Sequence, residues 1–103
     1  MTDKQSTNHI IDPGLQLITE DLYQTIDQLR YQLREINPPT QEQTNILNIL
    51  AAPMYEEIMV RLRNPKPNDT DQSYSVTLYI VKDTIEPYVE KAREILSLQS
   101  QEK

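Results

Sequence analysis

The stretch that decides the fold is residues 73–98, SYSVTLYIVKDTIEPYVEKAREILSL, because its first part fits either a helix or a strand. Residues 75–81 are rich in β-branched and aromatic side chains, which favour a strand. Apolar residues nevertheless recur at steps of three and four along the whole stretch, which is the period of a helix. They are Tyr74, Leu78, Val81, Ile85, Tyr88, Ala92 and Ile95.

A strand at residues 75–81 would also lack a partner. No other segment of the sequence is a good strand candidate, and an unpaired strand leaves its backbone hydrogen-bonding groups unmet. A long helical period outweighs the local strand propensity. We therefore predict one helix over residues 73–98, kinked near Pro87, where the proline ring removes a backbone donor.

A second long helix is predicted over residues 13–36. Asp12 precedes Pro13 and can cap the free N–H groups of the first turn. The prolines at 38 and 39 end the helix because a residue before proline is pushed out of the α region. One face carries apolar residues spaced seven apart, namely Leu15, Leu22, Leu29 and Ile36.

Between the long helices, residues 40–63 are predicted to form a middle helix. Thr40 and Gln43 fit a capping box at its start. Pro53 falls inside this segment and is expected to kink or break it. Short connections favour antiparallel neighbours, so the sequence predicts an all-α fold, a small helical bundle of two long helices around a broken middle helix.

The domain organisation expected from these elements is a single helical domain over residues 12–98. Residues 1–11 are polar apart from Met1, Ile10 and Ile11, and we expect a flexible tail whose isoleucines could be held against the core. Residues 99–103 are expected to fray.

The composition argues against catalysis and metal binding. The 103 residues include no cysteine, one glycine and one histidine. Disulfides, zinc–thiolate sites and thiol nucleophiles are therefore absent, and His9 in the tail cannot supply the several rigid ligands of a zinc site. Glu86 and Glu90 could act as paired carboxylates, but Lys91 and Arg93 are mixed among them, as is typical of a solvated face. We expect no enzyme, cofactor or metal.

Charge and targeting signals restrict the partners. The net charge is −6, with no basic segment, which disfavours direct binding to nucleic acid. No secretion signal or apolar run of membrane-spanning length is present, so we expect a cytoplasmic protein without membrane contact.

The sequence therefore predicts a non-catalytic helical module that binds a protein partner and associates with itself as a homodimer. The alternative is an acidic accessory subunit or regulator of a nucleic-acid-handling complex. The middle segment has more apolar groups than one helix face can bury, and tyrosines with off-stripe positions suit interfaces. The candidate partner-binding residues are Tyr23, Tyr31, Leu47, Met54, Tyr55, Met59, Arg61, Arg63 and Tyr79.

Overall fold

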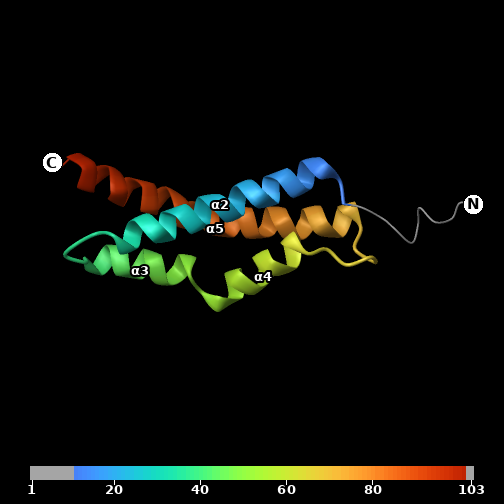
Figure 1. The fold of residues 1–103 in the computed structure, drawn as a ribbon, viewed down its shortest axis with the longest axis horizontal. Helices are drawn as coiled ribbons and strands as arrows, with labels where there is room; N and C mark the ends of the chain where they lie inside the picture. Colours follow the sequence, from blue (N-terminus) through green and yellow to red (C-terminus); the bar gives the residue numbers. More distant parts are fainter. Residues whose placement is uncertain (1–10, 102–103) are drawn as a thin grey trace, which may run out of the picture.

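The computed structural model describes residues 11–101, and this part of the chain is helical without any strand. It contains α2 (Pro13–Arg34), α3 (Gln41–Leu50), α4 (Pro53–Arg63) and α5 (Asp71–Gln101). The two long helices, α2 and α5, run in the same direction, while α3 and α4 return between their ends in the opposite direction (Figure 1). The predicted bundle of two long helices around a middle helix broken at Pro53 is confirmed.

The segment with strand propensity is part of α5. The helix continues without interruption through residues 75–81 and through Pro87, and it ends three residues beyond the predicted position. Its C-terminal half is inclined to its N-terminal half (Figure 1), as expected for a helix with an internal proline. It also begins two residues earlier than predicted, because the hydroxyl of Thr70 accepts from the backbone N–H of Ser73 at 3.1 Å and caps the first turn.

Side-chain caps also fix where α2 and α3 start, whereas α4 starts at Pro53 without one. Asp12 accepts from the backbone N–H of Gly14 at 2.9 Å, as its position before Pro13 predicts. The backbone N–H of Asp12 also donates to a carboxylate oxygen of Asp71 at 3.0 Å, which ties the starts of α2 and α5 together. The predicted capping box is present, with Gln43 N–H to Thr40 Oγ1 at 3.0 Å and Thr40 N–H to Gln43 Oε1 at 3.1 Å.

The core lies along the common axis of the helices and includes most of the predicted stripes. Ile11 is 2% exposed, so this isoleucine packs on the core, whereas Ile10 and the rest of the predicted tail up to it lie outside the described residues. The buried apolar residues are Ile11, Leu22, Ile26, Leu29, Leu33, Ile36, Ile46, Leu50, Tyr55, Met59, Leu62, Tyr74, Leu78, Val81, Ile85, Val89, Ala92 and Ile95.

The break at Pro53 shifts the buried face of the middle segment. The inward positions of α3 are Gln43, Ile46 and Leu50. An unbroken helix would continue that face near positions 54, 57 and 61. Instead Ala51 and Ala52 leave the helix, Pro53 starts a new one, and α4 turns Tyr55, Met59 and Leu62 inwards. Tyr55 and Met59, which were predicted to bind a partner, are therefore core residues, and those two predictions are wrong.

Gln43 is a polar side chain that is only 4% exposed. Its Nε2 donates to the backbone carbonyl of Leu33 at 2.8 Å, while its Oε1 completes the capping box with Thr40. That carbonyl lies in the last turn of α2, where regular intrahelical donors run out, and it also accepts from the backbone N–H of Ile36 at 3.3 Å. One side chain thus satisfies the end of α2 and the start of α3.

Replacing Gln43 with leucine is expected to lower the free energy of unfolding by about 1–3 kcal/mol, because the Thr40 N–H loses its partner and the Leu33 carbonyl loses its 2.8 Å bond and keeps the longer one from the Ile36 N–H at 3.3 Å. Urea denaturation followed by circular dichroism measures this loss. Gln41→Leu is the control, since Gln41 is exposed and its side chain bonds only to Asn45 of its own helix. Equal losses in the two variants would show that the bridging role is wrong.

Candidate interaction surface

Tyr23 and Arg63, two of the predicted residues, make a cation–π contact with each other within the chain. The Arg63 guanidinium carbon lies 4.0 Å from the centre of the Tyr23 ring, and its Nε donates to Glu20 Oε2 at 2.7 Å. The hydrogen bond with Glu20 raises the pKa of Arg63 above its ordinary value. This cluster joins α2 to α4, which gives Tyr23 and Arg63 a role inside the bundle.

The remaining candidates do not form one surface. Tyr31 is 64% exposed on α2, and Met54 is 58% exposed at the start of α4. Leu47 is half-buried against the core from α3. Arg61 is exposed on α4, with its Nη2 at 4.0 Å from Asp69 Oδ1. The predicted surface of tyrosines and middle-helix residues is therefore divided among four helices, α2, α3, α4 and α5.

Tyr79 is the predicted residue that lies among other exposed apolar side chains. Val76, Tyr79 and Ile80 are 52%, 43% and 60% exposed. They lie within five residues of α5, and at 100° per residue they share the face opposite the buried Leu78 and Val81. We call these three residues the outer strip of α5.

The outer strip lies in the segment of α5 that has strand propensity. Residues 75–81 favour a strand locally because they are rich in β-branched and aromatic side chains. In the folded chain one side of this segment packs on the core and the other side faces outwards. Val76 and Ile80 were not predicted as contact residues, although a helix that is apolar on both sides was the available signal.

Charged residues lie beyond both ends of the outer strip. Beyond Ile80, the same face of α5 continues with Asp83 and Glu90, and neither carboxylate makes an ion pair within residues 11–101. Near the start of α5 the exposed residues are of both signs, Arg61 and Lys66 together with Asp71. The end of α4 is held to the buried side of α5 there, because the Tyr74 hydroxyl donates to the carbonyl of Leu62 at 2.8 Å.

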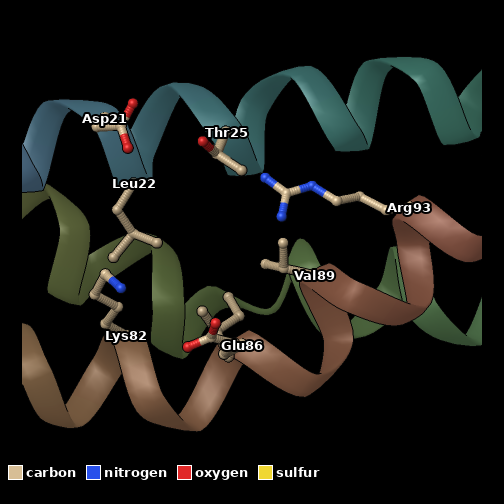
Figure 2. A pocket seen from close by; sticks show the side chains of 8 residues that line it. Asp21, Leu22, Thr25, Lys82, Glu86, Val89 and Arg93 are labelled. Carbon is tan, nitrogen blue, oxygen red and sulfur yellow. The ribbon is translucent and has the colours of Figure 1, made fainter.

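A small pocket lies between α2 and α5. It has a volume of about 110 Å³ and charged residues of both signs around it, namely Asp21, Lys82, Glu86 and Arg93. Figure 2 shows Arg93 reaching from α5 towards Thr25 of α2. Pockets for organic ligands usually measure about 300–1,000 Å³, so this one is too small for such a ligand.

Farther along the same seam is a wider, open groove of about 390 Å³, with Gln28, Gln32, Ser97 and Arg93 on its edges. The residues that line this groove include no pair of side chains that could act as a general acid and a general base.

Among the described residues, no group of three or more histidines or carboxylates is arranged to hold a metal ion. None of the helices within residues 11–101 combines the length and apolar character needed to cross a bilayer.

Comparison with known proteins found no match to a family model, to a curated protein or to a solved structure.

Proposed function

We propose that this chain is a non-catalytic protein–protein interaction module that docks through the outer strip of α5. The observation that carries the proposal is the grouping of Val76, Tyr79 and Ile80 on one exposed helix face. Folded chains seldom leave neighbouring large apolar groups in water without a binding role. Tyrosine strengthens the case, because its ring gives apolar contact area and its hydroxyl remains available to a polar partner.

The rest of the bundle supports this assignment by acting as a rigid scaffold for the strip. Leu78 and Val81, which alternate with the strip residues along α5, are 0% and 4% exposed and hold the helix on the core. A helix fixed in this way presents its outer face with a smaller entropy cost at docking, because its backbone is already ordered. Helical faces with anchors at spacings of three and four are a common mode of protein recognition.

A photoreactive amino acid placed at position 80 tests the proposal. We expect light to produce covalent adducts with protein at this position, both in cells of the organism that makes the chain and in the purified protein at high concentration. Tyr31 is the matched control position, because it is equally exposed but stands on α2.

A second substitution tests whether the adducts from position 80 depend on the outer strip. Adducts from position 80 should disappear when Val76→Lys is added, because a lysine would place a charge in the docking face. The proposal fails if position 80 yields no protein adduct in either setting, or if the adducts from positions 80 and 31 are equally abundant.

A further inference from the structure

We draw no further inference here: the strongest candidate, the outer strip of α5 as the seat of one particular partner, belongs to the surface already described, and nothing in the structure shows what covers it.

Discussion

Replacing Leu78 with alanine is expected to lower the free energy of unfolding by about 2–5 kcal/mol. Leu78 is 0% exposed and lies on the inner side of the segment that carries the outer strip. The substitution removes buried methyl groups and leaves a cavity that the packed helices fill only in part. A chain of this length has a total stability of about 5–15 kcal/mol, so a large share of it depends on this side chain.

Urea denaturation followed by circular dichroism at 222 nm measures this effect, and Val60→Ala provides the control. Val60 is 53% exposed on α4, so its truncation should change the stability by less than about 0.5 kcal/mol. A loss of less than half a kilocalorie for Leu78→Ala would contradict the helical packing of residues 75–81.

Replacing Tyr74 with phenylalanine is expected to cost about 1–3 kcal/mol, because it removes a buried hydroxyl that links three helices. The Tyr74 oxygen lies 2.7 Å from Thr19 Oγ1 and 2.8 Å from the carbonyl of Leu62. Thr19 Oγ1 is also 3.1 Å from the carbonyl of Leu15. Only two hydroxyl protons, one from Tyr74 and one from Thr19, are therefore available for three oxygen–oxygen contacts.

The direction of each hydroxyl proton depends on which of the two carbonyls already has a backbone donor. Leu62 lies in the last turn of α4, where its carbonyl lacks an intrahelical donor, whereas Leu15 lies at the start of α2 and its carbonyl has one. Tyr74 accordingly donates to Leu62, and Thr19 donates to Tyr74. Tyr74→Phe leaves both the Leu62 carbonyl and the Thr19 hydroxyl without this partner.

Thr19→Val tests that assignment. It retains the shape of the side chain and leaves the Tyr74–Leu62 hydrogen bond in place, so it should cost less than Tyr74→Phe. The two substitutions should also be less costly together than the sum of their separate losses, because they remove the same hydrogen bond. A larger loss for Thr19→Val, or simple additivity, would show that the proton assignment is wrong.

Much of the fold could be predicted because local signals and long-range periodicity agree. Asp12 and Thr40 are recognisable caps, Pro53 is a recognisable break, and apolar steps of three and four identify the inner faces of α2 and α5. These features depend on residues that are only a few positions apart in the sequence. The caps therefore appear in the structure at the predicted residues, and so does the inner stripe of α5, except that Val89 is buried where Tyr88 was predicted.

The surface was harder to predict because it depends on how the helices are rotated. The periodicity of residues 40–63 does not reveal the rotation introduced by Ala51 and Ala52, and this rotation buries Tyr55 and Met59. On α5 the β-branched and aromatic side chains of residues 75–81 favour a strand locally, and the helical period identifies only the inner face. Three of these seven side chains form the outer strip.

The measurement that tests the central claim most directly is photocrosslinking from position 80, with position 31 as the matched control. We predict covalent protein adducts from position 80 that disappear when Val76→Lys is added, and fewer adducts from position 31. No protein adduct from position 80, or equal adducts from the two positions, would contradict docking through the outer strip of α5.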